Sequence, residues 1–286
     1  MNNLIVFALH RQESAHIKEW LDYHLLVGVE KFFLRDNNSP GDPATLEILQ
    51  PYIDKGIVVN TPLVGKAAGQ QSQAYTEFIE SRPDAKWVAF IDIDEFLCPV
   101  LSDSVPDALA EFDDFAGVGI NWRCFGTSDC IKSPEYVTAS NYRRSYDHFP
   151  PNAHIKSIVR PERVTHCTGP HSFAPKEGFS IVNENHQSIP YAFSSPPSYT
   201  KLYINHYMLR SEEDYALKAS RGGGNSDKRT TQSNVFKSDR FVKFSASQLL
   251  KDPSFPQCHS FFWKHNVNHV EDHSLAERFL TRLKSM

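Results

Sequence analysis

Short, continuous apolar runs alternate with helical periodicity over residues 1–120. A continuous apolar run is typical of a strand that is covered on both faces. We predict four such strands, at "LIVFAL" (4–9), "KFFLRD" (31–36), "GIVVN" (56–60) and "WVAFID" (87–92).

Helical patterns separate these runs. In the first, Ser14 can act as the N-cap, apolar positions recur on one face, and Gly28 ends the helix. Two further helices are predicted at about residues 44–52 and 70–80. This alternation predicts an α/β fold, an open and mostly parallel sheet flanked by helices, in which ligands bind beyond the carboxyl ends of the strands.

The pattern changes after residue 120. Residues 121–245 are dense in proline, serine and aromatic residues, which predicts short strands and long loops in an irregular, acceptor-side half. Residues 246–286 return to helical spacing, with "SLAERFLTRL" as an amphipathic helix. We interpret residues 1–286 as a single domain made of these three parts.

Composition narrows the class of protein. The formal net charge is −4, and no basic stripe of the kind that binds nucleic acid is visible. Five cysteines without a CxxC pair favour reduced thiols, and no signal peptide or membrane span is recognisable. The sequence therefore predicts a cytoplasmic protein, with peripheral contact to the inner face of a membrane left open.

Three carboxylates follow the last of the apolar runs. Asp92, Asp94 and Glu95 come directly after "WVAFI". In an extended strand, Asp92 and Asp94 would point to the same face, about 7 Å apart. Two carboxylates this close repel unless a cation lies between them, and hard ions such as Mg²⁺ or Mn²⁺ prefer oxygen ligands. The alternative is a strand end whose acidic side chains face water.

Longer stretches of the chain resemble a known family. They lie in order between Leu4 and Gly224: "RQESAHIKEWLDYHLLVGVEKFFLRDNNS", "AKWVAFIDIDEFLCP", "NWRCFGTSD", "HIKSIVRPERV" and "INHYMLRSEEDYALKASRGG". These segments resemble the family 92 glycosyltransferases. The chain departs from the family at Gln12-Glu13, where relatives often read Asn-Glu, and at "FGTSD", where many read "FGSSG".

The resemblance implies a GT-A fold and a function. It implies a metal-dependent, inverting transfer of a hexose, with galactose favoured, from a UDP-sugar to a glycan or lipid-linked sugar acceptor, in polysaccharide biosynthesis. It also implies a D-x-D motif, here Asp92 and Asp94, that holds Mn²⁺ or Mg²⁺ with the donor diphosphate. By the same resemblance His206 completes the metal site, and His171 is a weaker candidate. Glu95 is expected to contact the metal ligands and orient them without binding the metal itself.

A diphosphate leaving group needs further positive charge, because negative charge develops on it in the transition state. We predict this charge from two basic pairs, Lys156 with Arg160 and Lys218 with Arg221. Residues near the ends of the first strands and in the third helix are predicted to bind the nucleotide: Arg11, Glu13, Asp36, Asn37 and Gln71. Ordinary solvated charge and turn formation are the alternatives for these residues.

Inverting transfer also needs a general base that takes the proton of the acceptor hydroxyl. Asp129 and Glu135 are the candidates, with Asp129 favoured. Trp122 and Phe125 could stack on the acceptor sugar, although core packing explains them equally well.

Two other classes of function compete with this interpretation. A metal-dependent phosphodiesterase could use the same acidic and histidine residues, and a non-catalytic carbohydrate-binding protein would bind sugar without metal. A zinc hydrolase is disfavoured, because His265, His269 and His273 share a helical spacing but lack an H-E-x-x-H motif.

Overall fold

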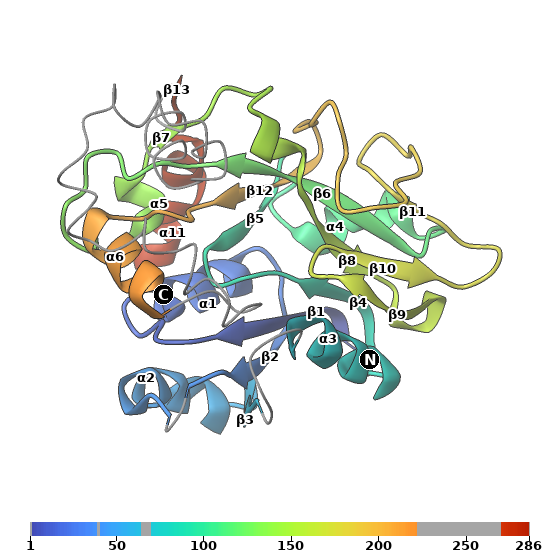
Figure 1. Cartoon of the computed structure of the whole chain (residues 1–286), viewed down its shortest axis with the longest axis horizontal. Coiled ribbons are helices and arrows are strands. Elements are labelled where there is room, and N and C mark those ends of the chain that lie inside the picture. Colours follow the sequence, from blue (N-terminus) through green and yellow to red (C-terminus); the bar gives the residue numbers. More distant parts are fainter. Residues whose placement is uncertain (1, 39–40, 64–69, 222–269, 286) are drawn as a thin grey trace.

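The first half of the chain alternates strands and helices, as its hydrophobic pattern predicts (Figure 1). The computed structural model describes the backbone of residues 2–38, 41–63, 70–221 and 270–285, with side chains except at 219–221 and 284. The strands of this half are β1 (Asn2–His10), β2 (Lys31–Asp36), β3 (Val58–Pro62) and β4 (Ala85–Phe90). The helices are α1 (Ile17–Leu26), α2 (Pro43–Asp54) and α3 (Gln70–Glu80).

The ends of α1 and α2 show which capping residues start and stop these helices. Asp42 is the N-cap of α2, and its carboxylate accepts a hydrogen bond from the backbone N–H of Thr45 at 3.3 Å. The expected cap of α1 by Ser14 is wrong: the N-cap position is His16, without a side-chain cap, and the backbone carbonyl of Glu13 accepts from the N–H groups of His16 and Ile17. Gly28 follows α1 with φ +97°, as its role as a helix stop predicts.

Where the structure describes it, the second half consists of short elements joined by loops, which confirms the predicted change of texture. Its strands are β5 (Glu95–Pro99), β6 (Gly117–Cys124), β7 (Arg143–Arg144), β8 (Ile155–Val159), β9 (Val164–Gly169), β10 (Ser172–Pro175), β11 (Ile181–Val182), β12 (Leu202–His206) and β13 (Val270–Glu271). Its α-helices are α4 (Val105–Leu109), α5 (Val137–Ser140), α6 (Glu212–Arg221) and α11 (Thr281–Lys284). A π-helical turn, η6 (Ala276–Leu280), precedes α11, and 3₁₀ turns lie at η1 (Ala110–Phe112), η2 (Pro150–Ala153) and η3 (Pro161–Arg163).

One large sheet connects both halves. Its strand order is β3-β2-β1-β4-β8-β6-β12-β5, with β11 paired to β6. Strands β3, β2, β1 and β4 are mutually parallel, and β8 is antiparallel to both β4 and β6. Strand β6 therefore runs in the same direction as β4, and β12 is parallel to β6. The carboxyl ends of all these parallel strands meet at one edge of the sheet, and the mostly parallel α/β class is confirmed.

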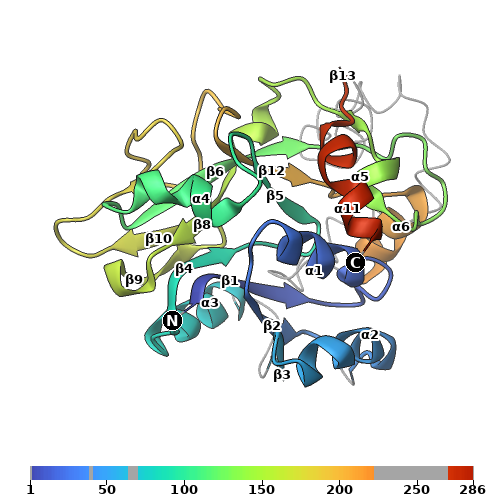
Figure 2. The same ribbon diagram turned by 180° about the vertical axis from the view of Figure 1, so that it is seen from behind.

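Helices cover both faces of this sheet (Figures 1 and 2), and β1 shows why. Its alternate residues Leu4, Val6 and Ala8 belong to a large core cluster that includes α1. Ile5 and Phe7 point the other way, into a second cluster with α3. A strand that is buried on both faces needs apolar residues at every position, which is the pattern in its sequence.

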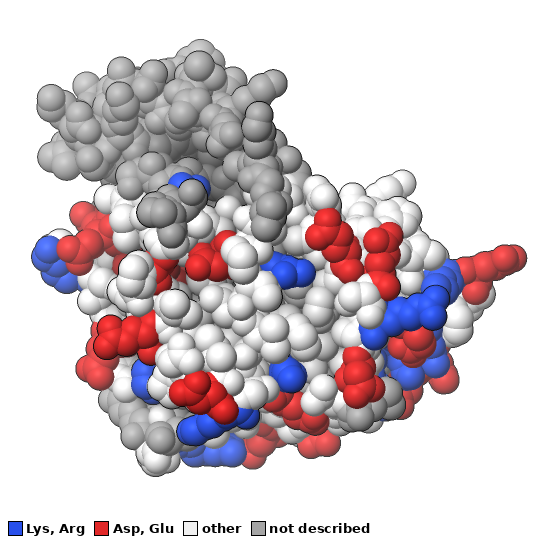
Figure 3. Space-filling view, turned by 90° about the horizontal axis from the view of Figure 1, so that it is seen from below, with Lys and Arg blue, Asp and Glu red and all other residues white. Residues whose placement is uncertain are grey.

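The end of the chain packs on the first helix. Phe279 of η6 is buried, and its ring lies 5.6 Å from that of Tyr23 in α1. The helical elements η6 and α11 confirm the helical interpretation of "SLAERFLTRL". Among the residues that the structure describes, none of the helices combines the length and apolar character that crossing a membrane requires. On the face seen in Figure 3, acidic and basic side chains alternate around a largely uncharged centre.

Gly117→Ala tests how closely the central strands approach one another. A methyl group at Gly117 would lie 2.7 Å from the backbone oxygen of Ile158 in β8, which cannot move without disturbing the sheet. We expect the free energy of unfolding to fall by about 1–3 kcal/mol, measured by chemical denaturation. In the matched control Gly169→Ala, the nearest atom is the Ser172 hydroxyl oxygen at 3.8 Å, so stability should change little. Equal stability of both variants would show that the approach of β8 to β6 is looser than described.

Candidate functional site

The acidic residues after β4 lie in a tight turn and not in an extended strand. Strand β4 ends at Phe90, and the backbone N–H of Glu95 donates to the carbonyl of Asp92 at 3.1 Å. The Glu95 carboxylate accepts from the backbone N–H of Asp92 at 2.8 Å and closes the turn from the other side. The expectation that Asp92 and Asp94 share one face of a strand is therefore wrong, because the turn sends their side chains to different partners.

Asp92 and Glu95 are held by one buried lysine. Lys156 is the second residue of the antiparallel strand β8, so it lies at the same sheet edge as the carboxyl end of β4. Its Nζ lies 2.8 Å from Asp92 Oδ2 and 3.7 Å from Glu95 Oε2, and its side chain is 1% exposed. Gln71 of α3 also donates to Asp92, at 3.0 Å. Burial would lower the pKa of Lys156, but the two carboxylates raise it, so the lysine stays charged.

Asp94 meets a different set of groups. Its carboxylate forms an ion pair with Lys218 of α6, and His206 Nε2 lies 3.7 Å from Asp94 Oδ1. Burial alone would raise the pKa of Asp94, but Lys218, His206 and Arg210 together hold it well below its usual range. Burial lowers the pKa of His206, so the imidazole is neutral near pH 7. Asp94 is thus a buried carboxylate that already binds positive charge.

Arg210 ties the end of β1 to the acidic turn. Its guanidinium donates to Glu13 at 2.7 Å and to the backbone carbonyl of Ile93 at 3.1 Å. Arg210 is buried, with 7% of its surface exposed. The negative charge of nearby Asp94 helps to stabilise its charged guanidinium group. The loop after β1, the acidic turn and the segment after β12 therefore form one connected unit.

A small pocket opens beside this unit. It is lined by residues of three segments: Gln12, Ser14, Ala15, His16, Met208, Arg210, Asp214, Leu217 and Lys218. In its wall, His16 Nε2 lies 3.0 Å from Asp214 Oδ1. Burial would raise the pKa of Asp214, but hydrogen bonds from His16 and Ser211 lower it to about 2. The pocket therefore presents both acidic and basic groups.

Aromatic rings lie on the other side of His206. Trp122, near the end of β6, has its ring centroid 4.3 Å from that of His206, and His171 contacts the Trp122 ring edge-on at 5.3 Å. His171 also hydrogen-bonds the backbone carbonyl of Ile155, next to Lys156. Phe125 is 1% exposed and packs against Tyr207, so it belongs to the core. Of the two predicted stacking residues, the structure brings only Trp122 to the candidate site.

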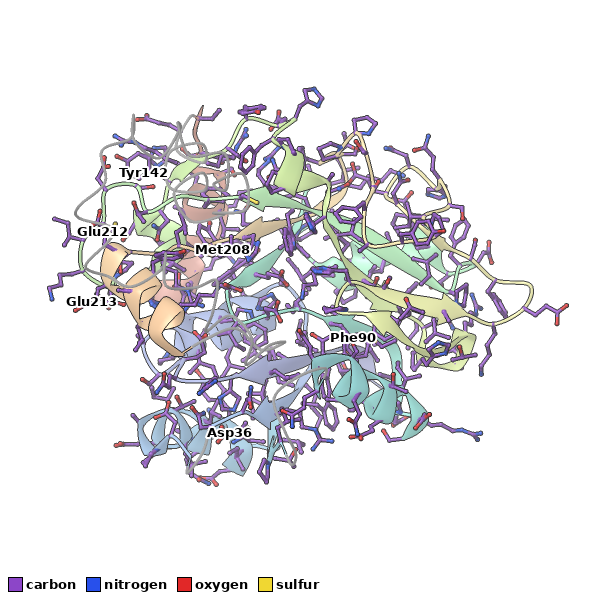
Figure 4. The ribbon with its side chains drawn as sticks, in the orientation of Figure 1. Asp36, Phe90, Tyr142, Met208, Glu212 and Glu213 are labelled. Atoms are coloured by element: carbon purple, nitrogen blue, oxygen red, sulfur yellow. The ribbon has the colours of Figure 1, made fainter. Side chains whose placement is uncertain are left out.

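The predicted nucleotide-binding residues occupy varied positions. Asp36 ends β2 and accepts from the backbone N–H of Asn38 at 2.8 Å, while the N–H of Asn37 donates to the His10 carbonyl. Figure 4 shows Asp36 well apart from Met208 of the pocket. Arg11 follows β1 directly and is exposed. Of this predicted group, Glu13 and Gln71 contact the unit described above.

Other predicted residues lie away from it. Arg160 follows the opposite end of β8, where it pairs with Asp113 and Glu162. Asp129 lies in the loop after β6, with φ +64°, and forms an ion pair with Arg143 at 2.5 Å. Glu135 is exposed in the same loop.

The remaining predicted residues lie mostly beyond what the structure describes. Arg221 is the last residue of α6, and its side chain is among those not described. His265 and His269 lie outside the described residues, and the ring of His273 stacks on that of Tyr142 at 4.8 Å.

Three contributors were missed from the sequence: Arg210, His16 and Asp214. Arg210 is the one basic residue in "MLRSEED", a stretch whose polar residues resemble those of a solvated turn. Its burial follows from the ion pair with Glu13, 197 positions away, which no local pattern announces. A lone basic residue a few positions after the buried strand β12 was the available signal.

The described side chains supply some of the ligands that a divalent cation needs, but not a complete set. Across the described ranges of the chain, no group of three or more His, Cys, Asp or Glu side chains is arranged around a common point. Asp94 and His206 offer one carboxylate oxygen and one imidazole nitrogen side by side, a donor pair that suits Mn²⁺. Asp92 is turned toward Lys156. The ammonium group of Lys218 forms an ion pair with Asp94, so this carboxylate already binds a cationic group.

Comparison with known proteins identifies relatives over most of the described part of the chain. The model of the family described as glycosyltransferase family 92 matches residues 8–192. A family 92 protein of Oryza sativa subsp. japonica is 29% identical over 187 residues, which cover 64% of this chain and 31% of the relative. One from Ricinus communis is 28% identical over 188 residues, covering 64% and 33%. The chain thus matches about a third of the length of these curated relatives.

Two solved structures are more distant. TarS of S. aureus, residues 1–349, has a TM-score of 0.41 at 15% identity, with 87% of this chain and 75% of that chain covered. The mannosyltransferase PcManGT from Pyrobaculum calidifontis, in complex with GDP-Man and Mn²⁺, has a TM-score of 0.41 at 10% identity, with 99% and 81% covered.

Glu95→Gln should reduce the pH dependence of stability. Burial raises the pKa of Glu95 to about 8, so the folded protein favours the protonated carboxyl group. The stability this group contributes is complete below its unfolded pKa of about 4.5 and is lost as the pH rises through about 8. Glutamine stays neutral, so the variant should lose less unfolding free energy across this window, by on the order of 2 kcal/mol.

Denaturant unfolding at the two ends of this pH window measures the effect. Glu177→Gln, at an exposed position, is the control and should follow the wild-type profile. A Glu95→Gln profile parallel to that of the wild type would contradict the protonation of Glu95.

Proposed function

Because the chain belongs to glycosyltransferase family 92, we propose that it transfers a hexose, with galactose favoured, from a UDP-sugar to a hydroxyl group of a glycan acceptor. The proposal includes GT-A architecture and a lipid-linked sugar as one form of the acceptor. One observation carries it: the acidic turn after β4 meets His206, Lys156, Lys218 and Arg210 at the carboxyl edge of the sheet. Ligands of open α/β folds bind at this edge.

We assign the divalent metal, Mn²⁺ or Mg²⁺, to Asp94 and His206. Asp94 is the buried carboxylate that pairs with the cationic Lys218, and the neutral His206 can donate a nitrogen lone pair. When bound, the metal would offset the charge of the departing diphosphate. Asp92 is the first residue of the motif, and its ion pair with the buried Lys156 favours a role in holding the turn or the ribose.

The basic groups around Asp94 have the arrangement that a diphosphate requires. Lys218 lines the pocket, and its side chain is 37% exposed, so the ammonium group can move from Asp94 to a phosphate oxygen. Arg210 lines the same pocket but is fixed by Glu13. We therefore assign phosphate binding to Lys218 and a positioning role to Arg210. The predicted partner of Lys218, Arg221, stays a prediction.

For the general base of an inverting reaction we retain Asp129, with Glu135 as the alternative. Asp129 lies on the loop that follows β6, the strand that carries Trp122, and its side chain is 79% exposed. An exposed carboxylate can accept a proton from a bound hydroxyl once its pairing with Arg143 is released.

We also retain the cytoplasm as the setting and polysaccharide biosynthesis as the role. The described cysteines Cys98, Cys124, Cys130 and Cys167 are free thiols, which is the usual state in a reducing compartment.

Asp94→Asn tests the transferase reaction. The substitution keeps the shape of the side chain and removes the charge that binds Lys218 and His206, so turnover should fall at least 100-fold, by about 3 kcal/mol of transition-state stabilisation. The measurement is Mn²⁺-dependent hydrolysis of a panel of nucleotide sugars, UDP-galactose included. Asp103→Asn is a matched control, since Asp103 is 76% exposed and pairs with Arg278. Full activity of Asp94→Asn, or wild-type cleavage of a simple phosphodiester without any nucleotide-sugar turnover, would contradict the proposal.

His206→Ala tests the metal assignment separately. The loss of a nitrogen ligand should raise the Mn²⁺ concentration needed for half-maximal hydrolysis by roughly 10- to 100-fold. His166→Ala serves as the control, because His166 lies in β9 and is exposed. An unaltered Mn²⁺ titration would remove His206 from the metal site.

A further inference from the structure

Five aromatic rings form a continuous row from the reaction centre to the surface. His206 contacts Trp122 at 4.3 Å between centroids, and Trp122 stacks on His154 at 4.9 Å with an interplanar angle of 16°. His154 contacts Phe193 at 4.4 Å, and His171 contacts both Trp122 and His154. We call this set the ring row.

Exposure increases along the ring row. His206 is 5% and Trp122 8% exposed, His154 and His171 are half-buried, and Phe193 is 53% exposed. One end of the row lies beside Asp94, and the other end lies in solvent. An acceptor must reach the reaction centre from solvent, and the ring row connects these two places.

The exposed end is held in place by the backbone. An isolated β-bridge joins His154 to Phe193, and the N–H groups of Ile155 and Ser194 donate to the carbonyls of Ala192 and Ala153 at 3.1 and 2.8 Å. An exposed aromatic side chain on a fixed backbone loses little freedom when a ligand stacks on it. Simple core packing does not require such a ring outside the core.

The buried part of the ring row contains an N–H group without a hydrogen-bond acceptor among the described residues. This group is the buried Nε1 of Trp122. Leaving a buried N–H without a partner is costly, and a site of this kind needs an explanation. A hydroxyl group of a bound sugar would supply the acceptor, while the neighbouring rings would pack against its C–H face.

We propose that the ring row is the acceptor subsite and binds hexopyranose rings, with Phe193 stacking on an outer sugar and Trp122 Nε1 donating to a hydroxyl of the sugar nearest Asp94. This inference rests on the proposed transferase function, because it assigns that enzyme's second substrate to a set of residues. It defines the acceptor by its chemistry, a saccharide of at least one hexopyranose unit.

The test measures sugar binding and donor turnover independently. Binding of methyl β-galactoside, methyl β-glucoside and lactose to the full chain is followed by saturation-transfer NMR in the presence of UDP and Mn²⁺. Phe193→Ala should weaken binding of the best probe about 3- to 10-fold, because it removes one stacking partner. Trp122→Phe keeps a ring but removes the N–H group and should weaken binding roughly 10-fold. Hydrolysis of UDP-galactose by the wild type, measured without a sugar probe, reports the donor reaction separately.

Phe179→Ala is the matched control. Phe179 is 40% exposed and contacts Arg163, not the ring row, so its removal should leave sugar binding unchanged. If Trp122→Phe melts at a much lower temperature than the wild type, Phe193→Ala alone decides the question.

Two results would overturn the inference: absence of binding by the wild type to every probe, or equal binding by Phe193→Ala and the wild type. Absence of nucleotide-sugar turnover in the wild type would instead contradict the proposed function. The two failures are therefore distinguishable.

Discussion

The buried ammonium group of Lys156 is the constraint on which the candidate site depends. The apolar strand β4 ends inside the protein, and the turn that follows carries Asp92, Asp94 and Glu95. Carboxylates in such a position are strongly destabilising unless they are paired or protonated. Lys156 neutralises Asp92 and approaches Glu95, and burial keeps Glu95 largely protonated near neutral pH. The turn can therefore present Asp94 to the ligand side without an excess of buried negative charge.

Much of the fold could be predicted because local patterns and tertiary packing agree in the first half of the chain. Helix α3 and strand β2 have the predicted bounds, since a helical period marks the first, a short apolar run marks the second, and the core buries both. The acidic segment was misinterpreted because its residues alternate like a strand. What decides its conformation is the pair of hydrogen bonds between Asp92 and Glu95, and side-chain closure of a turn leaves no periodic signal.

The sequence could identify residues of the candidate site only where the type of side chain was enough to indicate its role. Lys156 and Lys218 could be singled out as basic residues, and both contact the acidic turn. Arg160 was paired with Lys156 by sequence spacing, but four residues along a strand of about 3.3 Å per residue separate the two by more than 10 Å. The ion pair of Arg210 with Glu13 joins distant segments, so it depends on the sheet order and not on any local sequence.

Under the proposed function, the ion pair between Lys218 and Asp94 would make metal binding at this site an exchange reaction. A carboxylate that already holds an ammonium group does not simply add a second cation; the incoming ion takes the place of the first. The displaced ammonium group then needs an anion, and a diphosphate arriving with the ion provides one. In the proposed reaction, metal and donor would thus be coupled through a single side chain, and each would bind more favourably in the presence of the other.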